Sequence, residues 1–124
     1  PENPSVTPEL MGLITVPLGL FGAGKGGEGL QPCAPEEENH EAYYEAADGA
    51  PVVYHHVDPE GGHMDFTDSG AAGFCSAGQD PAATRAAATA VLVAFFRLHL
   101  NDEPGVVSWL TGDDVDPRLV WESK

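Results

Sequence analysis

Hydrophobic residues gather in two short runs and one helical stripe, a pattern that predicts alternating strands and helices. Residues 13–22 are almost continuously apolar, as is typical of a parallel strand buried on both faces. Pro17 interrupts this run and cannot donate a ladder hydrogen bond, so the centre of the strand is expected after it. Residues 52–57 are rich in β-formers and predict a second strand. Residues 80–100 predict a long amphipathic helix, with apolar residues at helical spacing: Ala87, Val91, Ala94, Phe95 and Leu98.

Polar and turn-forming segments connect these elements. Asn39 is a suitable N-cap for a short helix, and Asp80 followed by Pro81 is a suitable start for the long one. Proline and polar residues at the beginning of the chain predict an extended lead-in. The remaining segments are then a lead-in (1–12), a short helix (39–48), a loop containing His63 (58–79) and a C-terminal tail (101–124) with a short strand at 119–121.

The alternation of strands and helices indicates an α/β fold with a parallel sheet flanked by helices. Two clear strands are too few for such a sheet, because buried parallel strands need neighbours on both sides. We therefore expect the rest of the sheet to lie on another polypeptide or on an upstream segment. In this interpretation residues 1–124 form a single C-terminal segment of a larger domain.

The net negative charge of the chain disfavours some classes of binding partner. The 124 residues include 20 acidic and 5 basic side chains, which gives a formal net charge of −15. Phosphate binding needs Lys and Arg, so nucleic acids are not expected partners. Anionic membrane surfaces are disfavoured for the same reason. The acidity fits a highly soluble surface, a high-salt habitat or, less simply, a cationic partner.

The sequence gives limited information on location. No apolar run approaches the ~20 residues that span a bilayer, so no transmembrane segment is expected. The chain begins Pro-Glu-Asn-Pro, without the basic and apolar regions of a signal peptide. A leader could lie outside it. The composition fits either export or a salty cytosol, and we favour export.

Neither metals nor cofactors are expected. His55 and His56 are adjacent on a strand and should point to opposite faces, so they cannot bind one metal together. The glycine-rich stretch 22–29 satisfies GxGxxG after a strand. However, Pro32 and Pro35 exclude the helix N-terminus that a dinucleotide phosphate site requires.

His63 is the candidate for catalysis. It follows a strand and a turn with two glycines, and functional groups of α/β folds lie at the carboxyl ends of such strands. An imidazole can take a proton from a serine hydroxyl and return it to a leaving group near neutral pH. On these residues alone, a loop histidine without catalytic function is favoured over a catalytic one.

Three segments resemble the C-terminal third of chlorophyllase-like α/β-hydrolases, a group close to dienelactone-hydrolase-like proteins. The stretch Pro-Cys-Ala-Pro at 32–35, followed by Asn-His-Glu at 39–41 and Tyr-Tyr at 43–44, resembles that family's PCAP…NHEEFF. Gly-His-Met-Asp-Phe at 62–66 resembles the GHLDM around the catalytic histidine. Residues 93–100 resemble its closing helix. The resemblance covers residues 15–100 and implies an ester hydrolase with His63 as general base.

The resemblance also indicates what this chain lacks. In α/β-hydrolases the order is Ser, then Asp or Glu, then His, with the serine in GxSxG. None of the chain's serines lies in a GxSxG motif. The acid is expected just upstream of Pro1, or after the first strand, where only Glu28 is available. Asp65, with Gly62 and Met64, is expected to support the loop around His63 rather than to orient its ring.

The two cysteines leave two alternatives open. Cys33 and Cys75 could form a disulfide if the protein is exported, or they could be two buried thiols. Both should lie on the active-site side of the sheet, where a disulfide would brace the loop containing His63.

Three interpretations of the sequence are considered. In the first, the protein is the C-terminal chain of a serine esterase or lipase that acts on a chlorophyll-type or other hydrophobic ester. It would pair as a heterodimer with an N-terminal hydrolase chain that carries the serine, completing the catalytic triad. The alternative is a catalytically inactive hydrolase-derived binding or regulatory module. An acidic interaction domain unrelated to hydrolases would leave the three similar segments unexplained.

Overall fold

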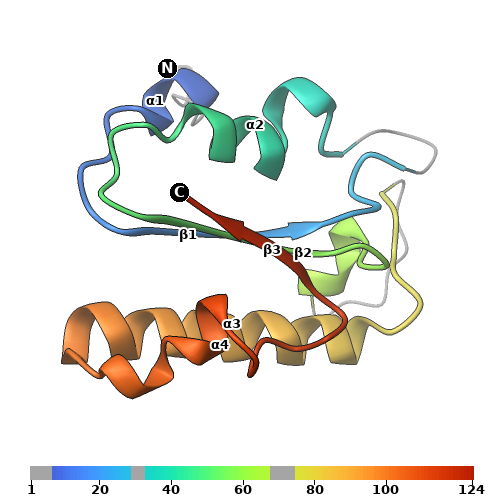
Figure 1. Ribbon diagram of the computed structural model, residues 1–124. Helices are drawn as coiled ribbons and strands as arrows, with labels where there is room; N and C mark the ends of the chain where they lie inside the picture. Colours follow the sequence, from blue (N-terminus) through green and yellow to red (C-terminus); the bar gives the residue numbers. More distant parts are fainter. Residues whose placement is uncertain (1–6, 29–32, 68–74) are drawn as a thin grey trace.

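The computed structural model describes residues 7–28, 33–67 and 75–124 and has three layers. A small sheet lies in the middle, and helices cover both of its faces (Figure 1). Helices α1 (Pro8–Met11) and α2 (His40–Ala46) form one outer layer, and α3 (Pro81–Asn101) and α4 (Ser108–Thr111) form the other. Three 3-10 helices complete the described elements: η1 (Glu36–Glu38), η2 (His63–Phe66) and η3 (Pro104–Val106).

The sheet has the order β1-β2-β3, with β1 at Leu18–Ala23, β2 at Val53–Asp58 and β3 at Val120–Ser123. β1 and β2 are parallel, with Leu18 opposite Val53, as the α/β pattern predicts. β3 runs antiparallel to β2, so the sheet is mixed rather than purely parallel. Within the described residues, β1 has a strand neighbour along only one of its two edges.

The first apolar run is only partly a strand, which corrects the expected range of 13–22. The β-ladder begins at Leu18, directly after Pro17, and Leu13 and Val16 are 75% and 61% exposed. The extended lead-in expected at 1–12 is also wrong for its last residues. These form α1, which has Pro8 in its first turn and buries Met11 against the α2 side of the sheet.

Both predicted helix caps are confirmed. The Asn39 side chain accepts hydrogen bonds from two backbone N–H groups at the start of α2, and Asp80 accepts one from Ala83. α3 ends where Asp102 adopts the left-handed conformation, with φ of 53°. The segment 101–124 contains the expected short strand, as β3 at Val120–Ser123. It also contains η3 and α4, and it contributes to the core.

Two apolar clusters hold the layers together. The larger lies between the sheet and α3 and α4, and it includes Tyr54, Val91 and the fully buried Leu110. The smaller lies on the α1 and α2 side and includes Val53. Successive residues of β2 therefore face different clusters, which follows from the alternation of side chains along a strand.

Helix α3 is relevant to the expectation that the chain has no transmembrane segment. By length and composition alone it is apolar enough to cross a membrane, contrary to our expectation from the apolar runs. The core helix of a globular domain passes the same criterion, and α3 buries Thr84, Ala87, Val91 and Ala94 in this fold. The helix is therefore only weak evidence for a span.

His56 is fully buried on the α4 side of β2. Its Nε2–H donates to the Leu110 carbonyl at 2.8 Å, and its Nδ1 has no partner among the described residues. Burial lowers the pKa of His56 below its ordinary value of 6.5, although the Leu110 contact opposes this. The ring is thus held neutral in the core.

We predict that His56 makes the protein less stable in acid. The unfolded chain takes up a proton near pH 6.5 while the folded ring resists it, so the free energy of unfolding should fall as the pH drops below 6.5. Denaturant unfolding at several pH values measures this slope. The slope should decrease in His56→Gln, and an unchanged slope in that variant would contradict the assignment.

Candidate active site

The loop after β2 places His63 at the carboxyl end of a parallel strand. β2 ends at Asp58, a tight turn follows, and His63 begins the 3-10 helix η2. Gly62 is required here, because a Cβ at this position would collide with the backbone of Ala77. The His63 side chain is exposed, although the glycine before it is buried.

Asp65 holds the loop from inside. Its side chain is fully buried and accepts hydrogen bonds from the backbone N–H groups of Gly62, at 2.9 Å, and Gly78, at 2.7 Å. The Thr84 hydroxyl of α3 lies 3.2 Å from the same carboxylate. This carboxylate therefore joins the two ends of the loop around His63, whereas His63 itself is exposed.

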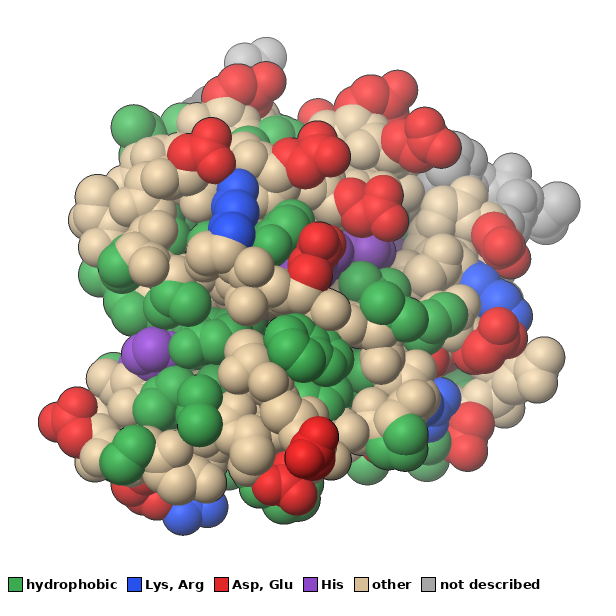
Figure 2. All heavy atoms as spheres, in the orientation of Figure 1, with side chains coloured by type: hydrophobic (Ala, Val, Ile, Leu, Met, Phe, Trp, Pro, Cys, Tyr) green, Lys and Arg blue, Asp and Glu red, His purple; other side chains and the backbone are tan. Residues whose placement is uncertain are grey.

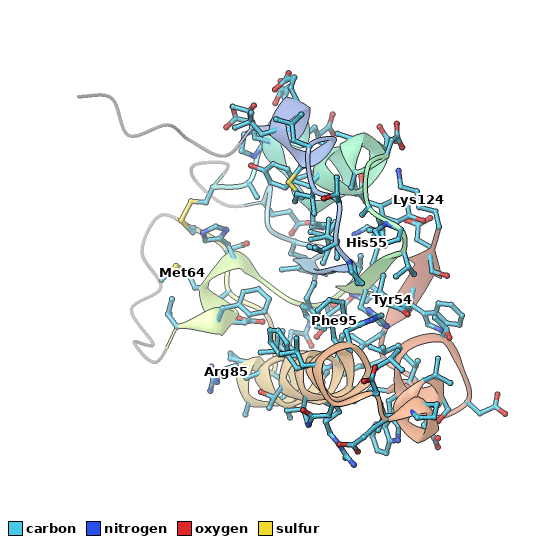
Figure 3. The ribbon with its side chains drawn as sticks, turned by 90° about the vertical axis from the view of Figure 1, so that its left-hand side faces the viewer. Tyr54, His55, Met64, Arg85, Phe95 and Lys124 are labelled. Atoms are coloured by element: carbon cyan, nitrogen blue, oxygen red, sulfur yellow. A yellow bond between two sulfur atoms is a disulfide. The ribbon has the colours of Figure 1, made fainter. Side chains whose placement is uncertain are left out.

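A second buried carboxylate, Asp58, anchors the end of β2. It forms an ion pair with Arg118 at 2.9 Å and accepts the N–H of Glu60 in the turn. Thr84 also lies 2.9 Å from it, so one hydroxyl bridges Asp58 and Asp65. Arg85 then donates to the Asp65 carbonyl at 2.8 Å. The first turns of α3 are thereby fixed to the loop (Figure 3).

The loop after β1 runs beside the loop containing His63. Lys25 donates its backbone N–H to the Gly61 carbonyl at 2.9 Å, and its side chain forms an ion pair with Glu60. Ser76 connects the two loops, because its hydroxyl donates to the Lys25 carbonyl and lies 3.3 Å from the His63 amide. The Ser76 carbonyl also accepts from Met64, at 2.9 Å.

A disulfide joins the same two loops, which confirms one of the two alternatives for the cysteines. Cys33 and Cys75 are bonded across a sequence separation of 42 residues. The bond is visible beside the loop that carries Met64 (Figure 3). It ties the segment before α2 to the segment after η2.

His63 lies on the wall of an open pocket of about 520 Å³. Phe21 and Phe66 meet edge to face there, with ring centroids 5.9 Å apart. Tyr43 and His40 of α2 also line this pocket. The lining is mainly apolar around a few polar groups, as is usual for sites that bind small organic molecules.

The structure does not bring Glu28 to His63. Glu28 is exposed after the β1 turn and lines a neighbouring pocket of about 560 Å³ with Glu36, Glu37 and Glu41. Among residues 7–28, 33–67 and 75–124, no carboxylate is hydrogen-bonded to the His63 ring. The acid that would orient this imidazole is therefore not identified within the described residues.

The sequence analysis missed a row of three hydrogen-bonded side chains, His40, His55 and Glu122, of which His55 is buried. His40 Nδ1 lies 2.8 Å from His55 Nε2, and His55 Nδ1 lies 2.9 Å from a carboxylate oxygen of Glu122. His55 and His56 do face opposite sides of the sheet, as predicted. Little in the sequence indicated these contacts, because the three residues are far apart in it.

The parallel strand pair, the helices on both faces and a histidine after the second strand define part of an α/β-hydrolase fold. The profile of the Chlorophyllase family matches residues 5–115, and the chain belongs to this family. Membership indicates an esterase-type hydrolase. No curated protein matches the chain.

We predict that Asp65→Ala destabilises the fold by about 3 kcal/mol, because two buried N–H groups lose a charged acceptor. Chemical denaturation measures the difference. Asp113→Ala removes an exposed carboxylate and should leave stability almost unchanged. Equal effects of the two substitutions would show that Asp65 does not organise the loop.

We predict that reduction of the Cys33–Cys75 disulfide costs about 3 kcal/mol, because the unfolded chain regains the entropy of a long closed loop. Unfolding curves with and without reductant measure this. A double variant with Ser at both positions should be insensitive to reductant. Alkylation of both thiols in the untreated protein would contradict the bond.

Proposed function

We propose that this chain supplies the general base, His63, of a serine carboxylic-ester hydrolase. The observation that carries the proposal is the exposed imidazole of His63 at the carboxyl end of β2, on a loop that buried carboxylates and a disulfide hold. Membership of the Chlorophyllase family supports it. A histidine needed only for structure would gain nothing from exposure beside an apolar pocket.

Ester hydrolysis of this kind requires a nucleophilic serine, and none of the serines of this chain lies in a GxSxG motif. A serine hydroxyl would attack the ester carbonyl while His63 accepts its proton. His63 would return that proton to the departing alkoxide, which leaves an acyl-enzyme and a free alcohol. Water, deprotonated by His63, would then hydrolyse the acyl-enzyme and release the acid.

We propose that an N-terminal hydrolase chain carries this serine and the acid that orients His63. Two features of the fold support such a partner. In the described residues, β1 is paired along one edge only, and an unpaired strand edge is a template for a further strand. On α3, one apolar stripe is exposed at helical spacing, namely Leu92, Phe96 and Leu100.

The apolar pocket favours a hydrophobic ester, and a chlorophyll-type ester fits the family. The rings of Phe21, Tyr43 and Phe66 provide apolar surface close to His63. A strongly charged acidic substrate would be repelled by the net charge of −15, part of which is visible as the many acidic side chains in Figure 2.

The alternative, a hydrolase-derived module that binds without catalysis, is favoured by one observation. The described residues contain neither a GxSxG serine nor a carboxylate on the His63 ring. A binding module would keep the pocket but would not depend on an ionisable group at position 63.

We predict that a fluorophosphonate probe will label a serine on a chain that co-purifies with this one. His63→Ala should lower labelling and ester turnover by about 1,000-fold, because the serine loses its base. His99→Gln is the matched control, since His99 packs against Tyr54 and Phe95 away from the pocket and should leave the rate unchanged. Intact mass spectrometry and a chromogenic ester assay measure both.

The outcomes separate the two candidates. If no second chain takes the probe and the isolated protein hydrolyses no ester, the enzyme proposal fails for this chain. If labelling occurs but His63→Ala leaves the rate unchanged, the hydrolase stands and His63 is not its base.

A further inference from the structure

The row of Glu122, His55 and His40 connects three elements across one face of the sheet. Glu122 Oε1 of β3 lies 2.9 Å from His55 Nδ1 of β2, and His55 Nε2 lies 2.8 Å from His40 Nδ1 at the start of α2. His55 is 2% exposed and lies on the side of the sheet away from Tyr54 and Phe95 (Figure 3). The side chain of Glu122 is 59% exposed, so solvent reaches the row at its carboxylate end.

These two hydrogen bonds determine the tautomers of both rings. A carboxylate only accepts hydrogen bonds, so His55 donates its Nδ1–H to Glu122. A neutral His55 then has a lone pair on Nε2, which accepts the Nδ1–H of His40. Burial is the main influence on the pKa of His40 and lowers it below 6.5, which favours the neutral ring. A neutral His40 with its proton on Nδ1 has a hydrogen-bond acceptor at Nε2.

The packing holds both rings of the row in place. Gly22 of β1 leaves room for His40, because a Cβ there would collide with the ring. The ring of Tyr44 stacks on His55, with centroids 4.9 Å apart and planes at 23°. Asn39 caps α2 directly before His40 and fixes the start of that helix. The position of the His40 ring is therefore set by β1, by β2 and by the first turn of α2.

The Nε2 atom of His40 has no hydrogen-bond partner within the part of the chain that the structure describes. In that part, the buried side-chain nitrogens without a partner belong to His56, His99 and Arg118, and His40 Nε2 is not among them. This nitrogen is therefore accessible. The His40 residue lines the pocket of about 520 Å³ that also contains His63. A ligand in this pocket can reach an unpaired acceptor.

The rest of the pocket limits the ligands that could use this acceptor. The rings of Phe21, Tyr43 and Phe66 make its lining mainly apolar. Glu38 also lines it, and the net charge of −15 disfavours anionic ligands. A neutral, mainly apolar molecule fits such a site. Among these molecules, one with an O–H or N–H is favoured, because without a donor the acceptor would lose its water and gain no partner.

We infer that His40 Nε2 is a hydrogen-bond acceptor that selects neutral, apolar ligands carrying a hydroxyl or N–H group. Glu122 determines this role from the other end of the row, because its carboxylate sets the direction of both hydrogen bonds. A glutamine in its place could donate through its amide and reverse that direction, which would move the His40 proton to Nε2. The inference concerns binding and is independent of the proposed hydrolase reaction.

We predict that both rings of the row carry their proton on Nδ1 at pH 8. Long-range ¹H–¹⁵N spectra of this chain distinguish protonated from unprotonated ring nitrogens. Glu122→Gln should convert part of the His40 population to the Nε2–H form. Glu45→Gln is the matched control, because Glu45 is an exposed carboxylate on α2 outside the row, and it should leave the tautomer unchanged. A proton on His40 Nε2 in the unsubstituted protein, or equal effects of the two variants, would overturn the inference.

Phenol and anisole test the acceptor directly, because both have one aromatic ring and only phenol has an O–H. Phenol should bind about fivefold more tightly, as expected for one hydrogen bond, and should shift the ¹⁵N resonance of His40 Nε2. The preference for phenol should disappear in His40→Phe and persist in His63→Ala. The resonance shift in the unsubstituted protein decides the matter if His40→Phe does not fold. Equal binding of the two probes, no binding of phenol, or a preference that is lost in His63→Ala would contradict the assignment.

Discussion

The hydroxyl of Thr84 is the contact on which the geometry around His63 depends. It lies within hydrogen-bonding distance of both buried carboxylates, Asp58 at the end of β2 and Asp65 inside η2. Both carboxylates are buried, and a buried polar group costs free energy unless it is hydrogen-bonded. The ion pair of Asp58 with Arg118 and the backbone N–H groups on Asp65 supply the remaining compensation. Helix α3 therefore determines the path of the chain after β2.

This arrangement separates the supporting side chain, Asp65, from the exposed side chain, His63. Asp65 faces inward and is saturated with hydrogen bonds from the protein, so it is not available to a substrate. His63 faces outward, beside apolar rings. The backbone between them is held from both sides, through Ser76 and through the disulfide. The backbone that carries this imidazole is held in place while the ring stays exposed, which the proposed role of His63 would require.

The sequence predicted the parts of this structure that depend on local rules. The helix caps Asn39 and Asp80 and the opposite orientation of His55 and His56 follow from short-range geometry. The disulfide remained one of two alternatives, because cysteine pairing depends on how distant loops meet. α1 was missed for a similar reason, whereas the short strand expected at 119–121 is present as β3. The few apolar residues of α1 form a stable helix only against the rest of the fold.

The hydrogen-bonded row of Glu122, His55 and His40 shows why contacts between distant polar side chains were the hardest part to foresee. Each of its residues has an ordinary local explanation: a helix start, a strand and an edge strand. Only the antiparallel return of β3, which sets Glu122 opposite His55, brings them together. Since β2 is buried on both faces, each of its two histidines needs a partner from a different layer. His56 is hydrogen-bonded to the Leu110 carbonyl, and His55 is hydrogen-bonded to Glu122. A strand that carries adjacent buried histidines thus constrains both helical layers at once, which an apolar strand would not do.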